Sequence, residues 1–146
     1  MQHLFIKLVF VFAISGLFNL PPNNTKLKLK IYNIKILKGN ILVYIYNKEG
    51  TIPDKDFSKY YKMKTVPVTG NTVEVNFDDL PKGKYAVMIH HDENKNGKLD
   101  KTFMRPKEGF GLSNFKSVNL FNKPDFEKAS FMLKKDTLIK INTIYF

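Results

Sequence analysis

Apolar and polar residues alternate along most of the chain, and this period of two is typical of β-strands with one buried face. The segment 27–31 alternates leucine or isoleucine with lysine, and Ile34 and Ile36 continue the pattern on the opposite parity. That change of parity predicts a β-bulge near Asn33. The denser apolar run 41–46 predicts a central strand with both faces covered.

Turn residues divide the rest of the chain into further short strands. Valines on both sides of Gly70-Asn71 predict a hairpin, and Pro67 marks its first strand as a sheet edge. Gly83 lies in the turn 80–85, where we expect a positive φ that only glycine adopts without strain. Further strands are expected at residues 85–91, 130–133 and 138–145.

Helical periodicity is almost absent from the sequence. Only the spacing of Phe57, Tyr60 and Tyr61 would suit a single helical turn, laid over a sheet edge. About seven strands without helical spacers predict an all-β fold, an antiparallel β-sandwich. The chain is long enough for one domain with a substantial core, which we place at residues 25–146.

The N-terminal segment has the pattern of an export signal. A weakly basic lead that includes Lys7 precedes the apolar run 8–14, and small residues up to Ser15 permit cleavage. We therefore expect residues 1–20 to be removed, and the protein to be periplasmic or extracellular, in association with the envelope or free. An uncleaved anchor is the alternative, although a spanning helix needs about 20 apolar residues. The chain has no cysteine, which excludes disulfides and lipid attachment through cysteine.

The formal charge of +11 at pH 7 raises the question of an anionic partner. The lysines are scattered over the expected strands and turns, and Arg105 is the only arginine. Because phosphate and base recognition usually recruits arginine, the pattern predicts no nucleic-acid partner.

The acidic loop, residues 92–100, has the spacing of a calcium-binding loop. Such loops place oxygen ligands at alternate positions, with a glycine at the sixth, and here the sixth residue is Gly97. The affinity should be weak, about 10⁻⁴ to 10⁻³ M, because lysines lie among the ligands. The alternative is that Asn96-Gly97 is an ordinary tight turn capped by carboxylates. The expected ligands within the loop are Asp92, Asn94, Asn96, the carbonyl of Lys98, and Asp100.

The twelfth position of a helix-loop-helix calcium site has a bidentate glutamate, whereas this chain has Phe103 there. Glu108 is the next glutamate along the chain. We expect the segment around it to fold back, so that Glu108 becomes the sixth ligand and one calcium ion ties two loops together.

Other candidate chemistry near the acidic loop is sparse. His90 and His91 are adjacent on an expected strand, so they point to opposite faces and should not share one ion. A metal-dependent hydrolase would have to use His91, Asp92 and Glu93. Ser113 lacks the second glycine and the strand-to-helix context of a nucleophile elbow, so we interpret it as a turn residue.

The segment 103–126 contains five phenylalanines among glycines, asparagines and lysines. A long segment of this kind is either packed or functional. The rings either close one end of the sandwich or form a recognition surface for a sugar or a peptide.

The run 80–100, read with residues 106–114, Phe126 and Ala129, resembles the uncharacterised bacterial family known as domain of unknown function 2141. The resemblance covers residues 27–145. It implies an exported all-β domain, immunoglobulin-like or prealbumin-like, and it implies no established activity. The Leu-Pro-x-Gly-x-Tyr turn also resembles one found in prealbumin-like modules.

The sequence thus predicts an exported, non-enzymatic β-sandwich binding module with calcium as a structural ion. Its ligand is unknown, and the partner classes are an envelope protein, a peptide or a glycan. The alternative function is a structural or interaction domain of a cell-envelope assembly. A metal-dependent envelope hydrolase is the third.

Overall fold

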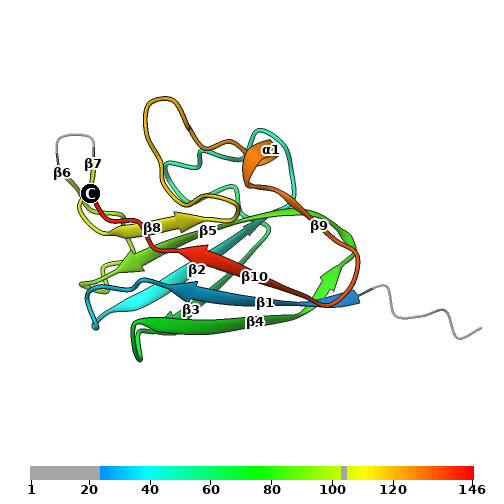
Figure 1. The fold of residues 1–146 in the computed structure, drawn as a ribbon, viewed down its shortest axis with the longest axis horizontal. Coiled ribbons are helices and arrows are strands. Elements are labelled where there is room, and N and C mark those ends of the chain that lie inside the picture. The colour runs from blue at the N-terminus through cyan, green and yellow to red at the C-terminus, as the bar shows by residue number, and fades with distance from the viewer. Residues whose placement is uncertain (1–23, 103–104) are drawn as a thin grey trace, which may run out of the picture.

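The computed structural model describes residues 24–102 and 105–146, so the expected export signal lies outside the described residues. Ten strands and one short helix make up this part of the chain (Figure 1). No helix in it is long and apolar enough to cross a membrane. The elements are β1 (Asn24–Tyr32), β2 (Asn40–Tyr46), β3 (Lys62–Pro67), β4 (Thr72–Pro81), β5 (Gly83–Asp92), β6 (Lys101–Thr102), β7 (Arg105–Pro106), β8 (Gly109–Leu112), α1 (Phe126–Ala129), β9 (Phe131–Leu133) and β10 (Thr137–Asn142).

The strands form two main sheets and a short ladder of β6 with β7. One sheet has the order β10-β1-β4, and the five-stranded sheet has the order β3-β2-β5-β8, with β9 also paired to β5. Among the described strands, every pair is antiparallel except β1 with β10. The predicted all-β fold is confirmed: two mostly antiparallel sheets, as in a β-sandwich, built from ten strands rather than about seven.

A continuous apolar core fills the space between the two sheets. The alternation in 27–31 places Leu27, Leu29 and Ile31 inward, and each is fully buried. Burial of one such side chain contributes about 1.5–3 kcal/mol to folding. Every side chain in 41–46 is buried, because β2 lies between two neighbouring strands and both of its faces are covered. The prediction of a central strand there is confirmed.

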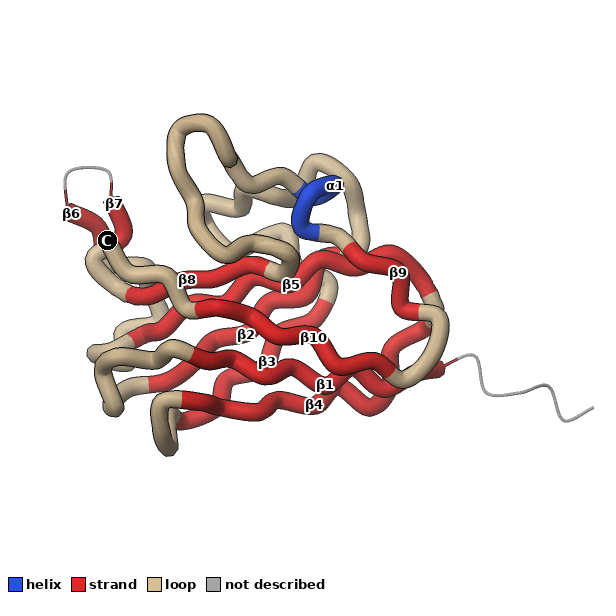
Figure 2. The backbone as a smooth tube through the Cα atoms, in the orientation of Figure 1, coloured by secondary structure: helices blue, strands red, loops and turns tan. Residues whose placement is uncertain are grey.

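A second apolar cluster covers the outer face of the five-stranded sheet. Figure 2 shows α1 and the long connections gathered on one side of the strands, next to β5 and β8. This face is therefore shielded from water and carries the candidate site. The cluster consists of Leu42, Tyr44, Tyr46, Ile52, Ala86, Phe110, Leu112, Phe115, Phe126 and Ala129.

Two predicted connections differ from the structure. Asn33 has a φ of 64° and follows the end of β1, so the chain leaves the sheet there instead of forming a bulge. The valines flanking Gly70-Asn71 do not form a hairpin, because β3 pairs with β2 and β4 pairs with β1. This connection crosses from one sheet to the other. Pro67 does lie on an edge strand, as predicted.

The aromatic segment before β3 is an irregular loop, and the predicted helical turn is absent from it. Phe57 has a φ of 49°, which is incompatible with a helix. Its ring stacks on Tyr44 at a centroid distance of 4.6 Å. The packing of Phe57 against the outer face of the sheet therefore determines the shape of this loop, and the helical spacing of its aromatic residues does not.

The expectation for Gly83 is also wrong. Gly83 begins β5 and has no positive φ, and a Cβ there would meet only the Tyr85 ring, at 3.5 Å. Gly39 has the demanding position instead. Its φ is +81°, and a Cβ would lie 2.2 Å from the Asp92 carbonyl oxygen and 2.7 Å from Glu93 Cα.

Gly39→Ala should therefore lower the free energy of unfolding by more than about 2 kcal/mol, because the new methyl group meets backbone at a strained φ. Gly83→Ala is the matched control and should change stability by less than about 0.5 kcal/mol. Urea denaturation measures both. Equal losses at the two positions would contradict this assignment.

Candidate functional site

The acidic loop follows β5 and is held by its own side chains. Asp92 is buried, and its Oδ1 accepts a hydrogen bond from the Asn96 N–H at 3.0 Å. Its Oδ2 accepts from the Gly97 N–H at 2.8 Å. Gly97 has a φ of +72°, which lets the chain reverse at this point. Asp92 thus has the capping role that carboxylates play in tight turns.

Asp100 closes the loop from the other end. Its Oδ2 accepts from the Asn94 side-chain amide at 2.8 Å, and its Oδ1 accepts from the Asn96 side-chain amide at 3.2 Å. The amide oxygens of Asn94 and Asn96 accept from the N–H groups of Asn96 and Lys98, at 3.0 and 2.7 Å. A calcium ion beside Asp100 would require the two amides to present oxygen instead of nitrogen.

Glu108 is buried beside the acidic loop. Its Oε1 accepts from the Glu93 N–H at 3.0 Å, and its Oε2 accepts from the Asp100 N–H at 3.1 Å. Oε2 also accepts from His90 Nε2–H at 2.9 Å. The structure therefore brings five of the six predicted ligands into one hydrogen-bonded group, whereas Lys98 joins it through its N–H and not through the predicted carbonyl. Glu108 contacts the main chain of the loop. A carboxylate can accept about four hydrogen bonds, and Glu108 accepts three.

The two histidines face opposite sides of β5, as the alternation predicts. His90 is buried on the outer face, where its ring stacks on Phe57 at 5.7 Å and its Nδ1 has no hydrogen-bond partner among the described residues. His91 Nε2–H donates to the Lys38 carbonyl at 2.8 Å, so its Nδ1 accepts from the Tyr145 hydroxyl at 2.8 Å. Burial raises the pKa of Tyr145, which keeps this donor protonated.

Ser113, like His91 and Asp92, is engaged in structural bonds. Ser113 is fully buried, and its hydroxyl lies between the Val87 N–H, at 2.9 Å, and the Ala129 carbonyl. It lies in a turn after β8, as predicted, and ties β5 to α1. Across residues 24–102 and 105–146, no group of three or more His, Asp or Glu side chains could hold a metal ion. The predicted calcium set differs from such a group, because it relies on two amides and a main-chain carbonyl.

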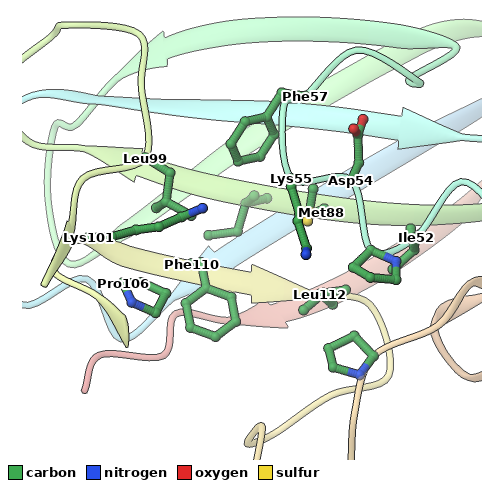
Figure 3. A pocket seen from close by; sticks show the side chains of 13 residues that line it. Ile52, Asp54, Lys55, Phe57, Met88, Leu99, Lys101, Pro106, Phe110 and Leu112 are labelled. Carbon is green, nitrogen blue, oxygen red and sulfur yellow. The ribbon is translucent and has the colours of Figure 1, made fainter. Parts of the chain in front are cut away.

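An apolar pocket of about 170 Å³ opens on the outer face of the five-stranded sheet, beside the acidic loop (Figure 3). Its walls come from the loop after β2, from β5, from the end of the acidic loop, from the β6–β7 ladder, from β8 and from the connection before α1. Asp54, Lys55 and Lys101 are the charged residues that line it. Its apolar lining includes Ile52, Phe57, Met88, Leu99, Phe110 and Leu112.

Sequence reasoning did not predict this pocket, because its lining comes from six parts of the fold that are separate in the sequence pattern. The phenylalanine-rich segment gave a partial signal. Phe110, Phe115 and Phe126 are buried as the packing interpretation predicts, although they cover a sheet face rather than one end. Phe121 is 98% exposed, and Phe103 lies outside the described residues.

Two packed β-sheets with an apolar pocket and a hydrogen-bonded acidic loop define an all-β protein of β-sandwich architecture, with its candidate site among the loops. The family model described as "Uncharacterized protein conserved in bacteria (DUF2141)" matches residues 29–140, and the chain belongs to this family. The resemblance predicted from the motifs is confirmed. Comparisons with the curated proteins and with the solved structures gave no match.

Glu108→Gln should destabilise the protein by about 2 kcal/mol, because the new amide N–H₂ must face one of three buried N–H donors. The amide protons of Glu93 and Asp100 should also exchange faster. Glu127→Gln is the control, since Glu127 forms an exposed ion pair with Lys84 that is worth under about 1 kcal/mol. Unchanged exchange at both amides would show that Glu108 does not brace the loop.

Proposed function

We propose that this protein is an exported, non-enzymatic binding module that takes a small apolar group into the pocket beside the acidic loop. The observation that carries the proposal is the pocket itself, an apolar space of about 170 Å³. An engineered protein cavity of about 150 Å³ binds benzene. The space here therefore suits one aromatic ring or one branched aliphatic group.

The wall of the pocket formed by the loop after β2 is fixed before a ligand arrives. Phe57 stacks between Tyr44 and His90, at centroid distances of 4.6 and 5.7 Å. Asp54 Oδ2 accepts from the Tyr46 hydroxyl at 3.2 Å and from the Lys59 N–H at 2.8 Å. Burial and the adjacent Asp54 raise the pKa of Tyr46, so its hydroxyl remains a donor. A preorganised wall lowers the entropic cost of binding.

Calcium is proposed as a structural ion of the acidic loop. The support is the convergence of Asp92, Asn94 and Asn96 on the carboxylate of Asp100, directly or through the loop backbone. Leu99 belongs to this loop and lines the pocket. An ion here would therefore stiffen a second wall of the binding site.

The kind of sandwich and the compartment are part of the same proposal. The Tyr85 hydroxyl donates to the Pro81 carbonyl at 2.8 Å, across the turn from β4 into β5. Immunoglobulin-like sandwiches have such a tyrosine corner, which supports an immunoglobulin-like or prealbumin-like type. Export is supported by the apolar run 8–14 behind Lys7. The non-enzymatic assignment is supported by the structural bonds of Ser113 and His91.

A second candidate function, an interaction domain of a cell-envelope assembly, is favoured by the connection between β8 and α1. Leu120 and Phe121 are 82% and 98% exposed. Asn119 Oδ1 accepts from the N–H groups of Phe121 and Asn122, at 2.9 and 3.0 Å, so this turn has a defined shape. A turn that presents two apolar side chains to solvent is suited to contact with a peptide or an envelope protein.

Calcium at about ten times its Kd should add roughly 1.4 kcal/mol of stability and raise the Tm by several degrees. Asp100→Asn should abolish this shift with little change in basal stability, because its contacts within the loop are to side chains. Glu93→Gln has the same charge change and should retain the shift. Magnesium should raise the Tm less, because it demands stricter geometry. If 10 mM calcium does not change the Tm of protein first treated with a chelator, the acidic loop is an ordinary turn and not an ion site.

A neutral aromatic probe tests the pocket. Toluene should shift the NMR methyl signals of Met88 and Leu112, which line the pocket. Leu99→Trp should remove the effect by filling the space from its half-buried rim, whereas Leu120→Trp adds the same indole at an exposed turn and should leave binding intact. If toluene does not shift these methyl signals in the unmodified protein, the pocket is not a binding site.

A further inference from the structure

We infer that the group received by the pocket is the apolar body of a small monoanionic acid, such as an aryl or short branched-chain carboxylate. This inference rests on the proposed binding function and names its ligand class. The floor of the pocket takes the apolar body, and two lysines at its mouth take the carboxylate.

Two cationic residues lie at the mouth of the pocket, and both are exposed there. Lys55 and Lys101 both line it. Figure 3 shows their side chains reaching over the space from opposite sides, one from the loop after β2 and one from β6. Neither amino group forms an ion pair in the part of the chain that the structure describes. Two ammonium groups beside an apolar floor favour an anionic partner more strongly than two on an open surface.

Asp54 is the one lining residue that would repel an anion, and its carboxylate is already engaged. It accepts from the Tyr46 hydroxyl and the Lys59 N–H. Figure 3 shows the carboxylate directed away from Phe110 and Leu112. The formal charge of the lining is therefore +1, from two lysines and one aspartate, which suits a monoanion.

The floor excludes other anions. Phe110 and Leu112 are buried apolar side chains, and Met88 lies beside them, so a bare phosphate or sulfate would gain no contact there. Specific phosphate sites usually use the forked donors of arginine, and the described lining contains none. The volume of about 170 Å³ holds one ring or a short branched chain and is too small for a long acyl chain.

The experiment compares benzoate with benzamide, its neutral isostere, by NMR titration of the Met88 and Leu112 methyl signals. Benzoate should bind about tenfold more tightly than benzamide, and added salt should weaken benzoate alone. Lys55→Gln and Lys101→Gln should each weaken benzoate binding about threefold to fivefold. The double variant should lose the preference for benzoate while its affinity for benzamide is unchanged. Lys95→Gln removes the same charge from an exposed loop position away from the pocket and should change neither affinity.

Each outcome distinguishes the ligand class from the proposed function. Equal affinities for benzoate and benzamide would overturn the acid class and leave the pocket as a binding site. If neither compound shifts the two methyl signals, the binding function fails as well. If Lys95→Gln weakens benzoate as much as Lys55→Gln does, the attraction comes from the net charge of the protein and the inference is wrong. An unchanged Tm for the lysine variants confirms that the comparison is made between folded proteins.

Discussion

The buried carboxylate of Glu108 is the constraint on which the site depends. Its three donors are His90 and the main-chain N–H groups of Glu93 and Asp100, so it holds both ends of the acidic loop against β5. Glu108 also directly precedes β8, whose first residue pairs with His91. One side chain thus fixes the loop, the register of an edge strand and, through both, two walls of the pocket. A buried carboxylate needs such donors, because burial without partners is costly.

The sequence was informative where the signal was local. The alternation in 27–31 reports which face of a strand is buried, and the spacing within the acidic loop places the side chains of Asn94 and Asn96 within hydrogen-bonding reach of Asp100. Alternation does not report which strands pair, however. The turn chemistry of Gly70-Asn71 is equally compatible with a hairpin and with the observed crossing between sheets. Likewise, the position of Phe57 follows from the stack with Tyr44 and His90, which no local pattern encodes.

The pocket is an unfilled space in the packing of the second apolar cluster. Protein interiors are packed as densely as organic crystals, so the side chains around an unfilled space lose part of their dispersion energy. The outer face of the five-stranded sheet could have been closed by larger residues at Leu99 or Met88, both of which are only partly buried. A chain that leaves this space open is less stable than it could be, which is the usual relation between a binding site and the scaffold that carries it.

The parallel pairing of β1 with β10 determines how the domain can be oriented on another structure. Because the two strands run in the same direction, the described chain starts at one end of the sheets and finishes at the other (Figure 1). The finishing end is the one that carries the acidic loop, since Tyr145 contacts His91 there. Asn24, the first described residue, therefore lies at the opposite end. A tether at the Asn24 end would attach the protein to a surface by that end. The acidic loop would then face away from the surface.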